Sequence, residues 1–266
     1  MKTLVVASLQ LQTLGMNGSK LDFYFKNAHA RGARLIVFGE YVLNHFYKEL
    51  ANMPVFMVKE QTNKHLTLLK SFSKQYNMVI IAPIVLHKKN GYVKVIAKIT
   101  SKQIAYYEQQ ILISYPHWDE QNFFANNIKP LKSPMIFSID GFRVMVMAGF
   151  ELHFPNLWDF VREKRVDLVV LPTSSTFGSH NRWREIIKTQ AFLYGCYVLR
   201  TNRLGEYSDK DIKWRFYGDS MLVRPDGEVE MMLEDKESML IEEIDKRLLQ
   251  EHRKAWQFEK ALQLRQ

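Results

Sequence analysis

The stretch Leu35-Ile36-Val37-Phe38-Gly39-Glu40-Tyr41 joins a short apolar run to a carboxylate in a turn. A short apolar run bounded by turn residues is typical of a buried β-strand. Loops at strand ends often carry catalytic or binding side chains, which makes Glu40 a candidate functional residue. A solvated glutamate at the end of a strand is the alternative explanation when Glu40 is considered by itself.

Similar short runs alternate with amphipathic segments along the rest of the chain. Apolar residues at helical spacing predict helices at 20–31, 59–76, 155–164 and 182–194, and β-rich runs predict strands at 4–9, 35–38, 78–86, 93–100, 103–107, 142–148, 167–171, 197–201, 221–224 and 229–233. Asn90-Gly91 predicts a hairpin turn, and residues 114–134 read as irregular. A length of 266 residues suits one domain. We predict an α/β domain over 1–243 and a charged C-terminal arm over 244–266.

The chain is basic, with 37 Lys and Arg against 28 Asp and Glu and a formal net charge of +9. Its densest basic run contains Lys88, Lys89, Lys94, Lys98 and Lys102, and we interpret this run as the solvated face of a hairpin. Aromatic residues do not interleave with Lys and Arg as in an RNA-stacking platform, so nucleic acid is not the expected partner. A basic scaffold for nucleic acid or an anionic membrane surface stays open on charge alone.

Cysteine content and apolar runs suggest a location. Cys196 is the single cysteine, so no intramolecular disulfide can form, which fits a reducing compartment. The apolar run at 4–9 is too short for a signal-peptide core, and no run is long enough to span a membrane. We therefore expect a cytoplasmic protein. The sequence lacks a Gly-rich phosphate loop and metal-ligand spacing, so neither a cofactor nor a metal is expected.

A second carboxylate follows another buried strand. The run Val144–Ala148 leads into Gly149-Phe150-Glu151, and Pro155 then opens a helix. Glu151 is thus a second candidate at a strand end. Charge compensation at the N-terminus of a helix is the alternative role for this residue.

The order of several segments resembles the nitrilase (carbon–nitrogen hydrolase) superfamily over residues 1–253. The segments that carry the resemblance are Val6–Gln10, Gly32–Glu40, Tyr107–Leu112, Gly141–Pro155, Asp167–Pro172, Trp183, Tyr197-Val198, Asn202–Gly205, Gly218–Ser220, Pro225–Glu228 and Glu243–Asp245. The resemblance implies a four-layer α-β-β-α sandwich. It also implies a homodimer, because subunits of this family often pair through helices and the C-terminal arm, and the arm here is rich in apolar residues.

The same resemblance implies that a catalytic apparatus has been lost. In the family a Cys thiolate attacks the carbon atom, a Glu acts as general base and a Lys stabilises the oxyanion. The matching register places Glu40 at the base, Gln109 at the Lys and Gly149 at the Cys. Glycine has no nucleophile, and glutamine brings no charge to the oxyanion.

Other family positions are less clearly matched. The family's second glutamate has no clear counterpart, although Tyr115, His117, Asp119 and Glu120 lie in the corresponding loop. We expect Phe150, Glu151 and His117 to line the pocket. Cys196 lies far along the chain from the motif and is interpreted as a buried structural residue.

These departures favour a catalytically degenerate protein, a pseudoenzyme that acts by binding a protein partner or a small ligand. The alternative is a carbon–nitrogen (amide) hydrolase with Cys-independent chemistry. In that alternative Glu40 activates a water molecule directly with the help of Glu151 or His117, and the space left at Gly149 holds the water.

Overall fold

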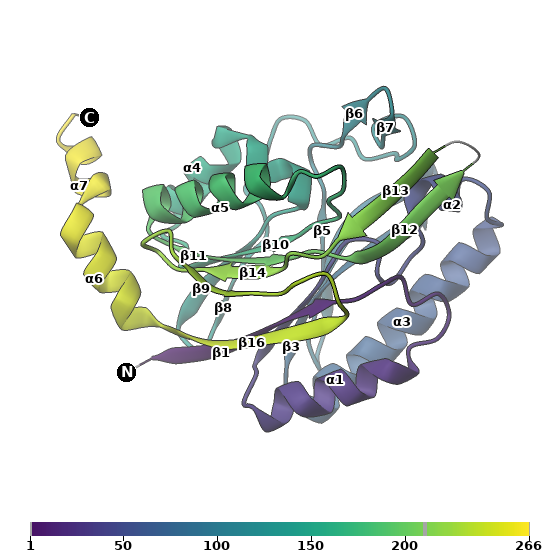
Figure 1. The fold of residues 1–266 in the computed structure, drawn as a ribbon, viewed down its shortest axis with the longest axis horizontal. Helices are drawn as coiled ribbons and strands as arrows, with labels where there is room; N and C mark the ends of the chain where they lie inside the picture. Colours follow the sequence, from purple (N-terminus) through teal and green to yellow (C-terminus); the bar gives the residue numbers. More distant parts are fainter. Residues whose placement is uncertain (1, 210–211, 266) are drawn as a thin grey trace.

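The structure is a computed structural model that describes residues 2–209 and 212–265. Two six-stranded sheets face each other, and helices cover both outer faces (Figure 1). The α/β class and the α-β-β-α order of layers predicted from the sequence are therefore confirmed. Among the described residues, no helix is both long and apolar enough to cross a membrane.

The first sheet contains the two terminal strands of the sandwich. In spatial order its strands are β16 (Ser238–Asp245), β1 (Thr3–Gln10), β2 (Leu35–Phe38), β3 (Val79–Lys88), β4 (Gly91–Ile99) and β5 (Ile104–Glu108). Strands β1, β2 and β3 run parallel, whereas β16, β4 and β5 pair antiparallel with their neighbours. The continuous apolar run of β2 suits a strand that is covered on both faces.

The second sheet also has parallel strands at its centre. In spatial order its strands are β15 (Val229–Met232), β14 (Met221–Val223), β11 (Tyr197–Thr201), β10 (Leu168–Pro172), β9 (Phe142–Val146) and β8 (Ile136–Ile139). Strands β9, β10 and β11 run parallel. Their carboxyl ends form the edge of the sheet where loops can carry functional groups.

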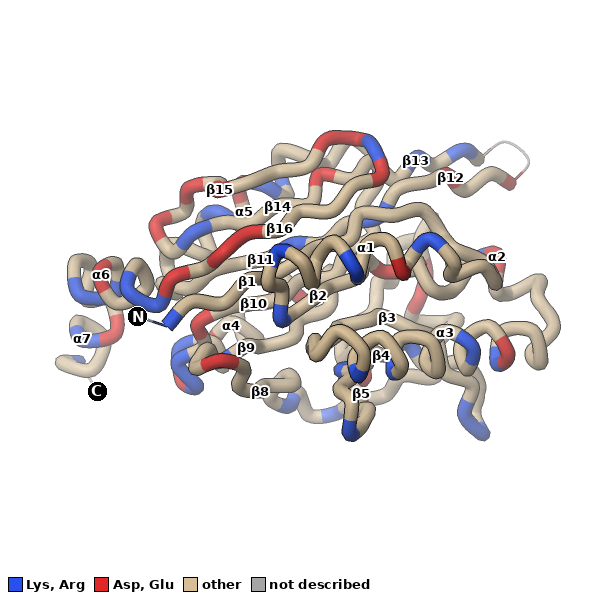
Figure 2. The backbone as a smooth tube through the Cα atoms, turned by 90° about the horizontal axis from the view of Figure 1, so that it is seen from below, with Lys and Arg blue, Asp and Glu red and all other residues tan. Residues whose placement is uncertain are grey.

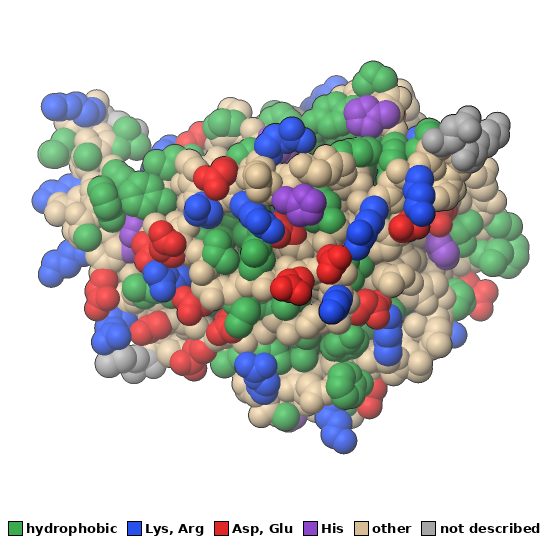
Figure 3. Space-filling view, viewed as in Figure 1, with side chains coloured by type: hydrophobic (Ala, Val, Ile, Leu, Met, Phe, Trp, Pro, Cys, Tyr) green, Lys and Arg blue, Asp and Glu red, His purple; other side chains and the backbone are tan. Residues whose placement is uncertain are grey.

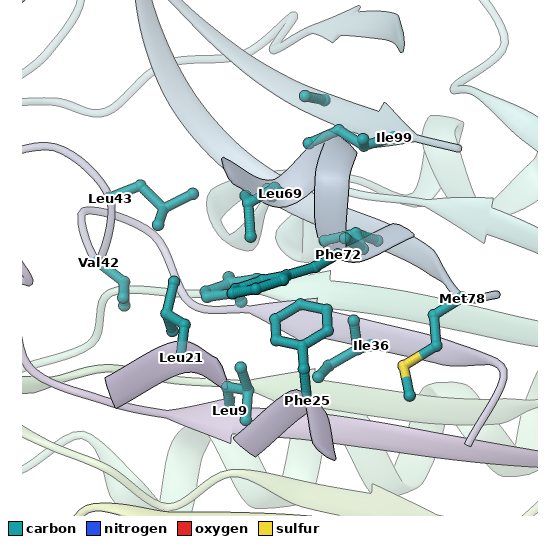
Figure 4. Packing of buried hydrophobic residues seen from close by; sticks show 14 of the residues in the cluster. Leu9, Leu21, Phe25, Ile36, Val42, Leu43, Leu69, Phe72, Met78 and Ile99 are labelled. Carbon is teal, nitrogen blue, oxygen red and sulfur yellow. The ribbon is translucent and has the colours of Figure 1, made fainter. Parts of the chain in front are cut away.

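The helices form the two outer layers. Helices α1 (Ser19–Ala30) and α3 (Val55–Tyr76) cover the first sheet, and α4 (Pro155–Glu163) and α5 (His180–Tyr194) cover the second. Between α1, α3 and the first sheet, the rings of Phe25 and Phe72 pack at 4.9 Å between centroids, close to Leu9 and Ile36 (Figure 4). The remaining helical elements are α2 (Tyr47–Leu50), η1 (Gly149–His153), α6 (Lys246–Trp256) and α7 (Phe258–Gln263).

The alternation of side chains along β2 explains the layers. Ile36 and Phe38 point to the helices, while Leu35 and Val37 point between the sheets. The inter-sheet layer also contains Val170 of the second sheet. Because the central strands of each sheet are buried on both faces, β2 and β10 read as apolar runs and were predicted.

Several elements differ from the sequence prediction. Helix α3 begins after Pro54 instead of at residue 59, since all four residues of its first turn (55–58) are apolar and so show no helical period, although only Val58 is buried. The paired strands β12 (Leu204–Asp209) and β13 (Ile212–Tyr217) were not predicted, and neither were β8 and β16. Ile244 and Asp245 complete β16, so the helical arm begins at Lys246. Within the irregular segment lie two short strands, β6 (Ser114–Tyr115) and β7 (Trp118–Asp119).

Basic side chains are distributed over most of the molecule. Lys and Arg occur on helices, strands and loops and are interspersed with Asp and Glu (Figure 2). Many are paired, as in Lys88 with Glu108 at 2.7 Å and Arg215 with Asp235 at 2.8 Å. This distribution agrees with a solvated surface for most of the basic residues.

Candidate functional site

Glu40 lies where the two sheets meet. It follows β2, and its backbone N–H donates to the carbonyl of Thr173, just after β10, over 3.1 Å. A Cβ atom on Gly39 would lie 3.0 Å from the carbonyl carbon of Asn202, so this close approach favours glycine. Tyr41 has a left-handed backbone with φ of 57°, a strained conformation of the kind that often marks functional sites.

A buried cluster of charges surrounds the Glu40 side chain. The ammonium of Lys94 on β4 lies 3.3 Å from Glu40 Oε2 and 2.9 Å from Glu120 Oε1. Tyr41 donates its hydroxyl hydrogen to Glu120. Glu40 and Lys94 are each 5% exposed, and Glu120 is fully buried. Two carboxylates therefore share one ammonium away from solvent.

The position of Lys94 corrects the sequence interpretation, which placed it on the wet face of a hairpin. Lys94 is buried because β4 is covered on both faces: Val93 and Val95 point to the helices, and Lys94 points between the sheets. Its place inside an apolar run was the signal that could have identified it. Glu120 was named only as one of four possibilities, and the structure brings it to Glu40 through Lys94.

Burial and the neighbouring charges shift the ionisation of this cluster. Burial raises the pKa of Glu40, and Lys94 opposes that rise. Burial disfavours the charge on Lys94, but Glu120 and Glu40 outweigh this effect and raise its pKa. The charged ammonium is therefore the favoured form of Lys94, and an ammonium is not a nucleophile. Among the described residues, Glu40 Oε1 has no hydrogen-bond partner.

Gly149 is packed tightly at the end of β9. A Cβ atom built there would lie 3.0 Å from the Pro172 carbonyl oxygen and 3.1 Å from Thr173 Cγ2. The first of these is a backbone atom of β10, so a side chain at this position requires its neighbours to shift by a few tenths of an ångström. The packing here therefore favours glycine.

Gln109 directly follows β5 and directs its side chain into its own loop. Its Nε2 donates to the carbonyl of Ile111 over 2.8 Å, and its backbone carbonyl accepts from Asn126 over 2.8 Å. The backbone N–H of Gln109 donates to the carbonyl of Lys94. The residue is buried, and the hydrogen bonds of its side chain serve the loop and not a carboxylate.

Glu151 connects β5 to η1. It accepts hydrogen bonds from the Tyr107 hydroxyl (2.8 and 2.9 Å), from Gln110 N (2.7 Å) and from Ala148 N (2.9 Å). Burial raises its pKa to about 7, with these donors acting in the opposite direction. The residue that we expected in the pocket therefore fastens two structural elements together.

A buried aromatic cluster, here called the aromatic plug, fills the space beside the carboxylates. It consists of Tyr41, Phe46, Tyr47, Leu50, Val58, Val85, Leu112, Trp118, Phe124, Tyr207, Trp214 and Phe216. Trp118 and Trp214 stack at 5.5 Å with an interplanar angle of 11°. A cavity of about 10 Å³ lies next to Tyr41 and Lys94, which is at most enough for one water molecule.

His117 and Phe150 lie near the surface, in contrast to the buried Glu151. The ring of Tyr115 is 5.7 Å from His117 and 5.7 Å from Phe150. His117 also lies 5.4 Å from Phe177, which is 48% exposed. The structure therefore brings two of the three expected pocket residues into one exposed aromatic patch, defined by Tyr115, His117, Phe150 and Phe177.

Cys196 lies in the hydrophobic core, away from Glu40 and Lys94. Cys196 is fully buried among apolar residues behind the second sheet, and burial raises its pKa to about 12. Its predicted structural role agrees with this position. In residues 2–209 and 212–265, no three His, Cys, Asp or Glu side chains are grouped to hold a metal ion.

The fold and site can now be compared with known proteins. Residues 5–254 match the family model for carbon-nitrogen hydrolases. An N-carbamoylputrescine amidase of Arabidopsis thaliana is 20% identical over 96% of this chain and 91% of its own length. The hydrolase in the agr operon of Staphylococcus lugdunensis is 26% identical over 70% of this chain and 78% of its own length.

Solved structures agree in fold. The crystal structure of a carbon-nitrogen hydrolase from Helicobacter pylori G27 superposes with a TM-score of 0.84 at 20% identity, covering 97% of this chain and 94% of that one. The family model alone spans most of the sequence. The chain therefore belongs to the carbon–nitrogen hydrolase family, the nitrilase superfamily.

Proposed function

We propose that this chain is a catalytically degenerate member of its family that acts through binding. The observation that carries the proposal is Gly149, which supplies no nucleophile. Atoms of Pro172 and Thr173 lie close to where a Cβ atom of this residue would be. Lys94 does not replace the nucleophile, because the carboxylates of Glu40 and Glu120 favour its protonated form. Cys196 is buried away from the site. The site thus retains a carboxylate base but has no group for it to activate.

The alternative function is hydrolysis by a water molecule that Glu40 activates, and the closed site disfavours it. The orphaned Glu40 Oε1 and the raised pKa of Glu40 favour a base at this position. Hydrolysis also needs room for water and a substrate, and the buried cluster and aromatic plug leave little. The same lack of room disfavours a small ligand in the old pocket.

Binding of a protein partner through the exposed aromatic patch is the mode that we propose. A cytoplasmic location, inferred from the single cysteine, belongs to the same proposal.

When it is incubated with simple amides, nitriles and N-carbamoyl compounds, the wild-type protein should release no more ammonia than the Glu40→Gln variant. Gly149→Cys should also form no acyl-enzyme, because the new side chain crowds β10, and it should lower the free energy of unfolding by about 1–3 kcal/mol. Ammonia assays and mass spectrometry of the intact protein provide the measurements. Turnover by the wild type that disappears in Glu40→Gln would refute the non-enzymatic role and support the water mechanism.

We also propose a homodimer formed through the C-terminal arm. The arm presents Trp256, Phe258, Leu262 and Leu264, which are 53%, 40%, 38% and 73% exposed. A groove of about 710 Å³ separates the arm from α4 and α5, and apolar side chains gather over this end of the molecule among Lys and Arg (Figure 3). Such an apolar surface is well suited to bury against a second copy.

Light scattering at micromolar concentration should give twice the 31.4 kDa mass of one chain. The double variant Trp256→Ser/Phe258→Ser should be monomeric, because it removes two aromatic side chains from the arm. Phe56→Ser is the matched control, since Phe56 is 67% exposed but lies at the start of α3. A monomeric wild type, or dissociation in the control alone, is incompatible with this arrangement.

A further inference from the structure

Lys94 is buried to a degree that is unusual for lysine. A buried ammonium is costly unless it is paired and hydrogen-bonded. Here Lys94 Nζ donates to both oxygens of Glu120, over 2.9 and 3.1 Å, and lies 4.9 Å from the centre of the Tyr41 ring. Its contact with Glu40 is longer, at 3.3 Å. The closest partner of Lys94 is thus Glu120 and not the residue at the base position.

The two partners come from different kinds of structure. Lys94 lies on β4, which pairs along its length with β3. Glu120 lies in the segment 112–126, which contains only the two-residue strands β6 and β7. Its backbone is braced locally, with Glu120 N donating to Ile113 O and Phe124 N donating to Glu120 O. The ion pair therefore joins a regular strand to an irregular segment.

The segment is attached to β4 at a second point. Asn126 accepts from Lys94 N and donates to Lys94 O, each over 2.8 Å. Ala125 N donates to Tyr92 O over 2.7 Å. The backbone of β4 thus holds the end of the segment, and the Lys94 ammonium holds its middle.

Removal of the Lys94 ammonium would leave two negative charges without a counter-ion. Glu40 and Glu120 would then be two carboxylates buried together, and removal of one partner from a buried ion pair is strongly destabilising. Moving residues 112–126 outward would bring Glu120 to water and separate it from Glu40. Opening of the segment is therefore the local route by which the lost charge is relieved.

We propose that Lys94 is a positioning residue whose ammonium holds Glu120, and with it residues 112–126, closed over Glu40. This role goes beyond the proposed function and does not require that turnover be absent. Hydrogen exchange tests it without reference to activity, so ammonia release would overturn the proposed function and leave this inference standing.

Amide hydrogen exchange should be compared in Lys94→Met, Glu120→Gln and the control Lys98→Met. Lys98 lies on the same strand, with its ammonium 4.9 Å from the Phe137 ring and away from the carboxylates. In the first two variants the amides of Phe124 and Ala125 should exchange at least about tenfold faster than in the wild type, while amides of β1 stay protected. Lys98→Met should leave both sets of amides unchanged.

Lys94→Met should have the larger effect, because it leaves two buried carboxylates, whereas Glu120→Gln leaves Lys94 paired with Glu40. Adding Glu120→Gln to Lys94→Met should therefore slow exchange relative to Lys94→Met alone, since a single carboxyl can take up a proton. Unchanged exchange at Phe124 and Ala125 in the folded variants would overturn the proposal. So would equal acceleration in β1, or loss of the fold in both variants, because either result would make the cluster a global and not a local support.

Discussion

Asp219→Asn should lower the free energy of unfolding by about 3–5 kcal/mol, because it leaves a fully buried arginine without its counter-ion. Arg200 is 0% exposed, and its Nη1 donates to Asp219 Oδ2 over 2.9 Å. Arg184 donates from Nε to the same carboxylate over 3.0 Å. Asp219 has φ of 69°, and asparagine tolerates this left-handed conformation, so the substitution chiefly removes the charge.

Urea unfolding at neutral pH measures this effect, and Asp235→Asn provides the matched control. Asp235 pairs with Arg215 at 2.8 Å, but the two side chains are 57% and 64% exposed. Exposed pairs contribute about 0–1 kcal/mol, so the control should unfold almost like the wild type. Equal losses in the two variants would contradict the importance of burial for the Arg200–Asp219 pair.

The parts of the fold that were predicted from sequence are those where local pattern and tertiary environment agree. Leu35–Phe38 is apolar throughout because it is buried on both faces, and Glu40 follows it directly into the site. By contrast, Ser238–Asp245 forms a strand only because β1 offers it an antiparallel partner. Its mixed composition carries no strong period, so the pattern did not reveal a strand.

The candidate site was harder to predict because its ion cluster joins residues that are distant in sequence. Lys94 was grouped with neighbouring lysines, although its place between Val93 and Val95 in an apolar run indicated a lysine that faces a second sheet. Glu120 lies in an irregular segment without periodicity, so its register could not be fixed. Phe150 and His117 were expected to line the pocket and lie instead in the exposed aromatic patch, whereas Glu151 is a buried acceptor for Tyr107 and Gln110.

Phe46→Ala tests whether the aromatic plug is a well-packed core and not a loosely filled pocket. The Phe46 ring lies within 5.5 Å of five other rings, those of Tyr41, Tyr47, Trp118, Tyr207 and Phe216. Deleting such a buried ring should lower the free energy of unfolding by about 3–5 kcal/mol, through lost transfer energy and the cavity left behind.

Phe56→Ala is the control, because Phe56 is 67% exposed and should change stability by less than about 0.5 kcal/mol. Urea unfolding of both variants gives the comparison, and a loss below about 1 kcal/mol for Phe46→Ala would mean that the cluster collapses easily around the gap. Phe46→Ala should also remain without Glu40-dependent ammonia release. A gain of hydrolysis in this variant would show that the plug, and not Gly149, is what prevents chemistry at Glu40. Stability and activity of one variant therefore separate the two physical reasons for an inactive site: the absence of a nucleophile and the absence of space.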